Sequence, residues 1–487
     1  MNSLEILDLV STSIGDDFRS VGLRYLENYI KLRAVSSAYD KEWMARGEIE
    51  KSISLASSFV DSLSLKGSKT SIRRIDGLSP LLIVDIEASP AYSGDNTVLI
   101  YGHIDKQPAT SPWDGGSDPF EPRYEGDRLY GRGVVDDGYS IVAAGIAIAN
   151  LQRIGLDHPR IKLLIEASEE SGSIDLPAHI EALGNELDGV DLVICLDSGG
   201  FDNDRLWRTT SLRGNIMMTV DVAVLEHGVH SGSAGGVVPS SFRILRRLLE
   251  RVEDSSTGSM VLPQLYCAIP SEVVEAARSN AIEANDPLGR LFPLVDGIEL
   301  PGEASERLLD QSWRPSMAFV GIDNVPSVAE AGNVLRSRTT AKLSFRIPPM
   351  VDGEVACEAI VRTLSEDPPY GAHVTVTADA PASGWFERPL PPNLIQLLDE
   401  VSLATFGKPS GACGEGGTIP FLAMLNRLLP KASILATGVL TPASNAHGPN
   451  EWISIEAATS LTKALAVVLG SAPFESDETS IDLGVHL

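Results

Sequence analysis

The chain has 487 residues, of which 43% are hydrophobic and 22% are charged, and its formal net charge is −27. A chain of this length exceeds one ordinary hydrophobic core, so we expect a soluble, globular protein of two or three domains. The negative charge argues against a nucleic-acid partner, because there is no basic stripe to neutralise phosphates.

The N-terminus and the cysteines bear on the cellular compartment. The chain does not begin with the basic start and long apolar run of a secretory signal, and no stretch approaches the roughly 20 apolar residues that span a bilayer. Its cysteines are isolated, so neither a disulfide framework nor a cysteine-rich zinc site is indicated. We therefore expect a cytoplasmic protein with no membrane partner.

The first predicted elements are helices, because apolar residues recur at helical spacing in 20–33 and 41–65. Short apolar strands then alternate with a helix, with strands expected at 97–105, 160–170 and 190–200 and the helix at 140–155. This alternation predicts a three-layer α/β/α domain around a largely parallel sheet.

The pattern changes near residue 213. Strands are expected at 215–224, 334–349 and 373–380, and helices at 240–254 and 354–367. With one further strand that is not located, this order fits an α+β domain of the split βαβ, ferredoxin-like kind. The stretch 255–333 is weakly periodic and is left without a predicted structure.

After about residue 392 the first pattern returns, with helices expected at 393–407 and 454–472 and a strand at 431–439. The first domain is therefore predicted to be interrupted by the second. The expected boundaries place residues 1–213 and 391–487 in the first domain and residues 214–390 in the inserted one.

Ionisable side chains gather where the predicted strands end. These residues are His103 and Asp105, Asp136 after the glycine-rich turn GRGVV, Glu169 and Glu170, Asp197, and His447 after the last predicted strand. Ligand sites in open α/β sheets lie at the carboxyl ends of strands, so we expect these side chains to lie close together.

Two histidines and three carboxylates, His103, Asp136, Glu170, Asp197 and His447, form a nitrogen and oxygen ligand set that suits zinc, cobalt or manganese. Five ligands are more than one catalytic zinc needs, and they favour two metal ions that share Asp136 as a bridge. Glu169 could then take the proton from a metal-activated water, and Asp105 could orient the ring of His103.

Each of these residues also has an ordinary structural interpretation. A His-x-Asp sequence in a loop is weak alone, an aspartate pair after a glycine turn often caps a helix, and a glutamate pair at a strand end is usually on the surface. Asp197 could sit in a capped turn and His447 in an ordinary loop. The combination, in one alternating domain, is what favours a metal site.

The motifs resemble a known family. They are LIYGHIDKQPA, PFEPRYEGDRLYGRGVVDDG, IEASEESGS, VICLDSGG, LRGN, HGVHSGSAGG, LSFRIPP, GEGGTIP and AHGPNE, in order from residue 99 to 451. This set is similar to the di-zinc metallopeptidases of the carnosinase, acetylornithine deacetylase and aminoacylase family, and most similar to the carnosinase-like dipeptidases. The stretch 255–333 has little that matches.

The resemblance implies a role for each matching residue. One zinc would be held by His103, Asp136 and Asp197, and the other by Asp136, Glu170 and His447. Glu169 would be the general base, with Asp105 as the carboxylate behind His103. The inserted domain would be a lid that forms a homodimer, and its His230 would polarise the substrate carbonyl in the partner subunit. Arg346 would bind the free carboxylate of the substrate in a pocket lined by Gly417 and Thr418.

The chain departs from the family where a lysine commonly follows the aspartate pair, because Gly138 and Tyr139 follow it here. Lys106 stands where an apolar residue is frequent, and it could supply the missing positive charge to Asp137.

The resemblance implies a metal-dependent exopeptidase that hydrolyses a dipeptide or a related N-acyl amino acid through metal-activated water. Two alternatives stay open. One is an amidase or deacylase of the same mechanism that acts on N-acyl, N-acetyl or N-carbamoyl amino acids. The other is a non-catalytic relative that binds a ligand or partner.

Overall fold

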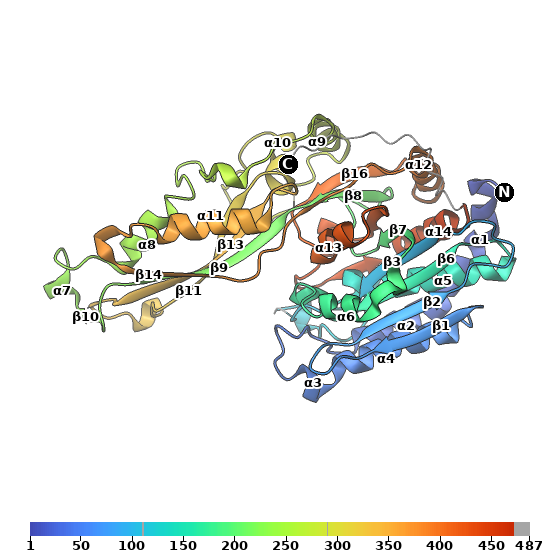
Figure 1. Ribbon diagram of the computed structural model, residues 1–487, viewed down its shortest axis with the longest axis horizontal. Coiled ribbons are helices and arrows are strands. Elements are labelled where there is room, and N and C mark those ends of the chain that lie inside the picture. The colour runs from blue at the N-terminus through green and yellow to red at the C-terminus, as the bar shows by residue number, and fades with distance from the viewer. Residues whose placement is uncertain (110–111, 290, 472–487) are drawn as a thin grey trace. The chain divides into compact units, whose positions relative to one another are not determined.

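The computed structural model describes residues 1–109, 112–289 and 291–471, and the chain divides into two compact units (Figure 1). The first unit comprises Met1–Thr209, Glu387–Cys413 and Met424–Leu487, and the second comprises Thr210–Phe386 and Gly414–Ala423. The last part of the predicted segment 391–487, residues 472–487, lies outside the described residues.

A large mixed sheet forms the centre of the first unit. Its strands lie in the order β1 (Ser68–Arg73), β2 (Leu81–Ile86), β6 (Arg160–Glu166), β3 (Thr97–His103), β7 (Val190–Cys195), β17 (Ser433–Gly438) and β8 (Trp207–Leu212). Strands β6, β3, β7 and β17 are parallel, whereas β2 and β8 pair with them antiparallel, and β1 with β2 likewise. The expected largely parallel sheet is thus parallel at its centre and antiparallel toward its edges.

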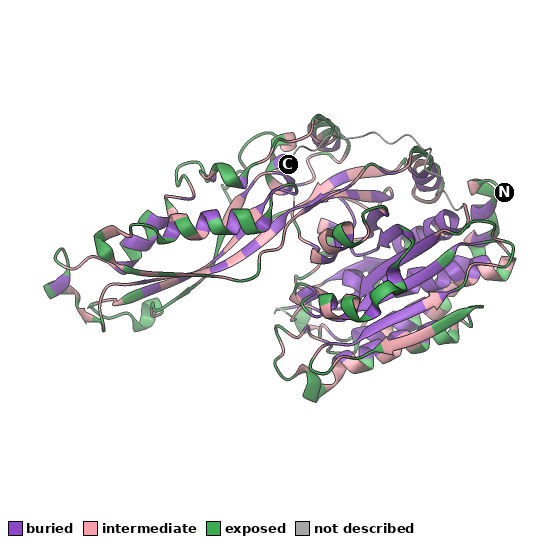
Figure 2. Cartoon of the chain, in the orientation of Figure 1, coloured by how far each residue is buried: buried purple, intermediate pink, exposed green. Residues whose placement is uncertain are grey.

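Helices accompany this sheet to make the α/β layers. They are α1 (Ser3–Asp17), α2 (Leu23–Ile30), α3 (Trp43–Arg46), α4 (Glu48–Ser62), α5 (Ser140–Ile154), α6 (Leu176–Leu183), α12 (Pro392–Phe406) and α14 (Ile455–Ser471). One hydrophobic core joins Val10 of α1, Ile146 of α5 and Leu465 of α14 with the strands. Figure 2 shows the central strands as buried, which explains why they are apolar on both faces.

The stretch Val134–Ile154, which includes α5, is long and apolar enough to cross a bilayer, but 94% of its most apolar window is buried in the structure. That is the pattern of a core helix. A small sheet in the same unit has the order β18 (Trp452–Ser454), β5 (Arg128–Tyr130) and β4 (Arg123–Glu125). It joins the segment after His447 to the segment before Asp136.

The second unit contains a four-stranded antiparallel sheet in the order β11 (Ser316–Asp323), β13 (Arg338–Ile347), β9 (Gly214–Ala223) and β14 (His373–Ala378). Helices α8 (Ser241–Leu249) and α11 (Gly353–Ser365) share its hydrophobic core. The chain order β9-α8-β11-β13-α11-β14 is a split βαβ arrangement, so the predicted fold class is confirmed. The strand that sequence reasoning did not locate is β11.

Shorter elements complete the unit and its boundary. They are β10 (Val229–His230), α7 (Ser231–Ala234), α9 (Ser271–Glu283), α10 (Ala304–Ser312), β12 (Val334–Leu335), β15 (Trp385–Phe386), β16 (Gly411–Glu415) and α13 (Pro420–Leu428). Helices α9 and α10 lie, like β11, in the stretch 255–333 that was left without a predicted structure. Residues Gly414–Ala423 group with the second unit, although the sequence placed them in the first domain.

Candidate metal centre

The carboxyl ends of three neighbouring strands supply most of the predicted ligands. His103 is the last residue of β3, the loop after β6 carries Glu169 and Glu170, and Asp197 follows β7 by two residues. Because β6, β3 and β7 are adjacent and parallel, their ends meet at one edge of the sheet. A short 3₁₀ turn at Glu169–Ser171 breaks the strand geometry after β6.

Asp136 lies between the two imidazoles. Its Oδ1 is 3.1 Å from Nε2 of His103, and its Oδ2 is 2.8 Å from Nε2 of His447. The same nitrogen of His447 is 3.2 Å from Oε2 of Glu170, and that of His103 is 3.7 Å from Oδ1 of Asp197. The five residues thus form two groups that share Asp136, and within each group the ligand atoms lie within 4.8 Å of one another.

The charges of the site favour added cations. Burial, the like charges of Asp136 and Glu170 and the opposing effect of His103 together raise the pKa of Asp197 to about 6. Burial and the charge of Asp197 raise the pKa of Glu169 well above its ordinary value. Buried carboxylates at this density repel one another, and divalent metal ions would neutralise them. The donor set and its charge therefore fit a pair of divalent metal ions.

The carboxylates of the site also favour positive charge on the imidazole of His447. Against the effect of burial, the carboxylates of Asp136 and Glu170 raise the pKa of its imidazole to about 11. A proton on Nε2, which lies 2.8 Å from Asp136 and 3.2 Å from Glu170, is therefore favoured in the metal-free site. Metal binding would release that proton, because a histidine ligand must be neutral.

Asp105 lies behind His103, as the sequence suggested, but its carboxylate mainly binds the turn that carries Glu169 and Glu170. Its Oδ1 and Oδ2 accept hydrogen bonds from the backbone N–H groups of Glu169 and Glu170, at 3.1 and 3.0 Å. Nδ1 of His103 is 3.1 Å from the main-chain oxygen of Asp105 and 3.5 Å from its carboxylate. Asp105 therefore fixes the glutamate turn as well as the imidazole. Glu169 is close by, with Oε2 4.0 Å from Nε2 of His103.

Sequence reasoning missed several residues that hold the ligands. The backbone N–H and the Nε2 of Gln107 donate to the two oxygens of Glu170, at 3.1 and 2.8 Å. Arg132 and Glu451 form a buried ion pair of 2.7 Å between the segments that carry Asp136 and His447. Each lies inside a motif singled out above, but no spacing rule connects residues so far apart.

The structure does not place Lys106 against Asp137. Its Nζ donates instead to the main-chain oxygens at the end of α2, those of Tyr29 at 2.8 Å, Ile30 at 3.3 Å and Leu32 at 2.9 Å. The suggestion that Lys106 neutralises Asp137 is therefore wrong.

Asp137 is fully buried, and its Oδ2 accepts the backbone N–H of His103 at 3.2 Å. Burial and the charge of Asp197 raise its pKa well above the ordinary value, so the neutral carboxyl is favoured. Gly138 has no room for the family lysine, because a Cβ there would lie 2.2 Å from Cε1 of Tyr29.

The predicted substrate-binding residues lie in the second unit. Nη1 of Arg346, on β13, donates to Oγ1 of Thr418 at 2.8 Å, and Gly417 precedes Thr418 in the same loop. Oγ1 of Thr418 in turn donates to the main-chain oxygen of Arg213 at 2.5 Å. His230 is exposed at the end of β10, and its Nδ1 accepts the backbone N–H of Gly232 at 3.1 Å.

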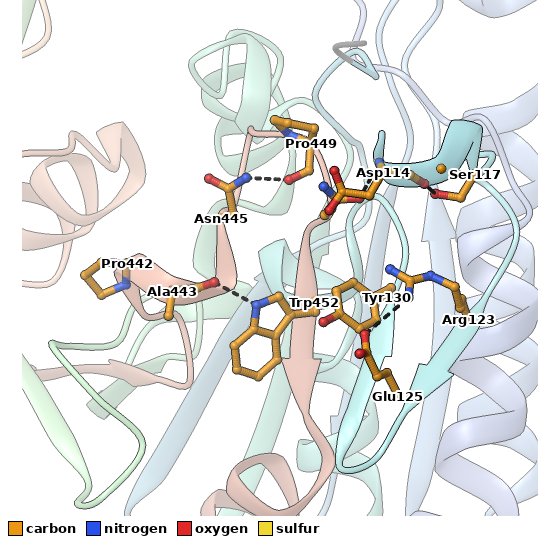
Figure 3. A pocket seen from close by; sticks show the side chains of 12 residues that line it. Asp114, Ser117, Arg123, Glu125, Tyr130, Pro442, Ala443, Asn445, Pro449 and Trp452 are labelled. Atoms are coloured by element: carbon orange, nitrogen blue, oxygen red, sulfur yellow. Dashed lines mark hydrogen bonds and ion pairs between the residues drawn. The ribbon is translucent and has the colours of Figure 1, made fainter. Parts of the chain in front are cut away.

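A pocket of about 650 Å³ lies beside the loop that carries His447, and none of the five predicted ligands lines it (Figure 3). Its lining includes Asn445, Pro449 and Trp452 from this loop and the strand after it. The indole N–H of Trp452 donates to the main-chain oxygen of Ala443 at 2.7 Å, and the side-chain amide of Asn445 donates to the main-chain oxygen of Pro449. These two hydrogen bonds hold the loop that carries His447 in its conformation.

The family model described as peptidase family M20/M25/M40 matches residues 99–471, which is more than half of the chain. The chain belongs to this family. The predicted family membership is confirmed, and the protein is a metal-dependent hydrolase of the metallopeptidase class.

Several similar proteins are named as dipeptidases. The cysteinylglycine-S-conjugate dipeptidase of Corynebacterium striatum is 28% identical over 364 residues, which cover 73% of this chain and 77% of the relative. The human Beta-Ala-His dipeptidase is 25% identical over 393 residues, which cover 78% and 75%. The solved structure of the dipeptidase Dug1p from Saccharomyces cerevisiae has the same fold, with a TM-score of 0.77, 21% identity and coverage of 97% and 99%. The predicted metal-dependent, dipeptidase-like function agrees with these relatives.

Proposed function

We propose that this protein is a di-metal exopeptidase that hydrolyses the amide bond of dipeptides or related N-acyl amino acids. The observation that carries the proposal is the position of Asp136, whose two carboxylate oxygens face two different imidazoles. In this proposal His103, Asp136 and Asp197 hold one ion, and Asp136, Glu170 and His447 hold the other. Zinc is the proposed metal, with cobalt and manganese as the alternatives that the same donors suit.

Metal ions in such a site supply Lewis acidity and lower the pKa of a water molecule. The protein residues supply the remaining steps. Glu169 takes the proton from the attacking water and later delivers it to the leaving amine. The position of Glu169 supports this role, because its Oε2 lies 4.0 Å from Nε2 of the proposed ligand His103 while Glu169 is not one of the five proposed ligands. Asp105 keeps Glu169 in place through the backbone of the turn.

Substrate recognition is assigned to the second unit. Arg346 would bind the free carboxylate of the substrate, with Gly417 and Thr418 beside it, and this contact would limit cleavage to short substrates. The 2.8 Å hydrogen bond between Arg346 and Thr418 supports a common pocket for these residues. A guanidinium suits this task because its paired N–H groups match the geometry of a carboxylate.

The second unit, residues 214–390 in the sequence prediction, would be a lid that also forms a homodimer. The exposed apolar side chains of edge strand β11 support an interface there, since Phe319, Val320 and Ile322 are 46%, 53% and 39% exposed. His230 would reach the active site of the partner subunit and polarise the substrate carbonyl. The proposed compartment is the cytoplasm.

The test is the metal content of the purified protein together with hydrolysis of a substrate panel before and after chelation. The panel contains dipeptides, including Cys-Gly and β-Ala-His, and N-acetyl, N-acyl and N-carbamoyl amino acids. We expect about two metal ions per chain, and dipeptide hydrolysis that chelation abolishes and zinc, cobalt or manganese restores. Hydrolysis confined to the acylated amino acids would assign the protein as a deacylase. A chain that neither binds metal nor hydrolyses any of these substrates would overturn the proposal.

A further inference from the structure

The buried pair of Arg132 and Glu451 lies between the two chain segments that carry Asp136 and His447. Arg132 is 1% exposed and Glu451 is 0% exposed, and the two are 319 positions apart in the sequence. Nη1 of Arg132 donates to Oε2 of Glu451 at 2.7 Å. The indole ring of Trp113 lies beside the guanidinium, 5.8 Å from its central carbon, and helps to shield the pair from water.

Each member of the pair binds the ligand-bearing segment of the other. The carboxylate of Glu451, which follows His447, accepts the backbone N–H groups of Gly133 at 2.9 Å, Val135 at 3.1 Å and Asp136 at 3.4 Å. The guanidinium of Arg132, which precedes Asp136, donates through Nη2 to the main-chain oxygens of His447 at 3.2 Å and Gly448 at 2.8 Å. The pair therefore fixes both segments relative to each other at the backbone.

Stability alone is a weak reason to bury this pair. Taking two charges out of water costs several kcal/mol per ion, and an apolar replacement of similar size is often no less stable. What an apolar pair cannot do is bind five backbone groups in the two ligand-bearing segments. Small displacements of Asp136 or His447 would spoil a metal site, because ligand distances tolerate only about 0.2 Å.

We propose that Arg132 and Glu451 are a positioning pair that sets metal affinity by fixing the backbone of Asp136 and His447. This inference rests on the proposed di-metal function. It assigns the two residues distinct effects. Arg132 acts on the group that contains His447, whereas Glu451 acts on Asp136, which both groups share.

Two conservative variants separate these effects. Arg132→Lys keeps the charge next to Glu451, but its one nitrogen cannot occupy both the Nη1 position at Glu451 and the Nη2 position at the oxygens of His447 and Gly448. Glu451→Gln keeps the size of the side chain but removes the charge that binds three N–H groups. In titrations of the metal-free protein with zinc and with cobalt, we expect Arg132→Lys to weaken one of the two binding events by about 10- to 100-fold. Glu451→Gln is expected to weaken both by a factor of that order.

The matched control is Asp85→Asn. Asp85 is partly buried and pairs with Arg160 at the start of β6 and with Lys162 at 3.2 Å, at the opposite end of the strand from the ligands. We expect this variant to lower the unfolding free energy of the metal-free chain and to leave both metal affinities unchanged. The absorption spectrum of bound cobalt, which reports ligand geometry, should change in the two pair variants and stay unchanged in the control.

The outcomes are distinguishable. Wild-type affinity and an unaltered cobalt spectrum in both pair variants would overturn the positioning role. So would an affinity loss matched by Asp85→Asn, because the effect would then follow general stability. If Glu451→Gln does not fold, the titration of Arg132→Lys alone tests the positioning role. Selective weakening of one metal-binding event would support the role, and wild-type affinity would contradict it. A wild-type chain that binds no metal at all would instead contradict the proposed function.

Discussion

At the scale of single residues, the shared carboxylate explains why two adjacent aspartates follow a glycine-rich turn. Asp136 faces both imidazoles, and hydrogen bonds from His103 and His447 lower its pKa although burial opposes them. Asp137 belongs to neither ligand group, its Oδ2 accepts the backbone N–H of His103, and burial and the charge of Asp197 raise its pKa. The fold therefore favours the anion at Asp136 and the neutral carboxyl at Asp137.

Glu169→Gln isolates proton transfer from metal binding. Glutamine keeps the shape of the side chain but cannot accept the proton, so we expect kcat to fall by about 100-fold or more. The number of bound metal ions should stay at its wild-type value, because Glu169 is not one of the five proposed ligands. The measurements are steady-state kinetics with metal analysis of the same preparation. A variant that keeps its kcat would remove Glu169 from the mechanism.

At the scale of elements, the end of β6 is a second place where a buried acid shapes the site. Glu166 is 2% exposed and accepts hydrogen bonds from Tyr101 at 2.7 Å, Ser168 at 3.1 Å and Ser173 at 2.8 Å. Ser168 and Ser173 flank the turn that carries Glu169 and Glu170. Through these hydrogen bonds Glu166, the last residue of β6, connects the turn to β6 and to Tyr101 of β3.

Burial and the charge of Asp105 raise the pKa of Glu166 from 4.5 to about 7. The folded chain thus favours the neutral acid, and the stabilisation is complete below pH 4.5 and is lost as the pH rises through 7. Glu166→Gln is neutral at every pH. In metal-free protein, its unfolding free energy relative to wild type should therefore rise by about 3 kcal/mol at most between pH 5 and pH 8.5.

Denaturant unfolding at several pH values measures this difference. The control is Glu181→Gln, which removes an exposed carboxylate from α6 and should give a flat difference over the same range. A flat difference for Glu166→Gln as well would show that Glu166 is ionised throughout, contrary to our expectation.

The elements that the sequence predicted correctly have either strong burial or a regular alternation, as β14 has with its exposed and half-buried positions. Strand β3 is buried at every position, and the helix α5 is almost entirely buried, so their apolar patterns are unmistakable. Strand β11 was missed because it is a partly exposed edge strand without alternation. Helix α1 was also missed, although Asn2 and Glu5 form a capping box that marks its start.

The predicted ligands, like the predicted elements, could be found because each lies in a recognisable local sequence pattern. Five predicted ligands come together because each lies at or after the end of a buried strand or after a glycine-rich turn, and parallel strands bring such positions to one edge. The pair of Arg132 and Glu451 has no such signal. Its members meet only because β18 pairs with β5, where Trp452 lies opposite Tyr130, and a pairing across more than three hundred residues leaves no local pattern.

At the scale of the whole molecule, the proposed homodimer can be tested by complementation. Glu169→Gln chains and His230→Ala chains are each expected to be inactive. If a site combines Glu169 of one subunit with His230 of its partner, every mixed dimer holds one site in which both residues are intact. Random pairing makes about half of the dimers mixed, so mixing should restore about a quarter of wild-type activity. If mass spectrometry demonstrates subunit exchange and the mixture is still no more active than either variant alone, each subunit completes its own site.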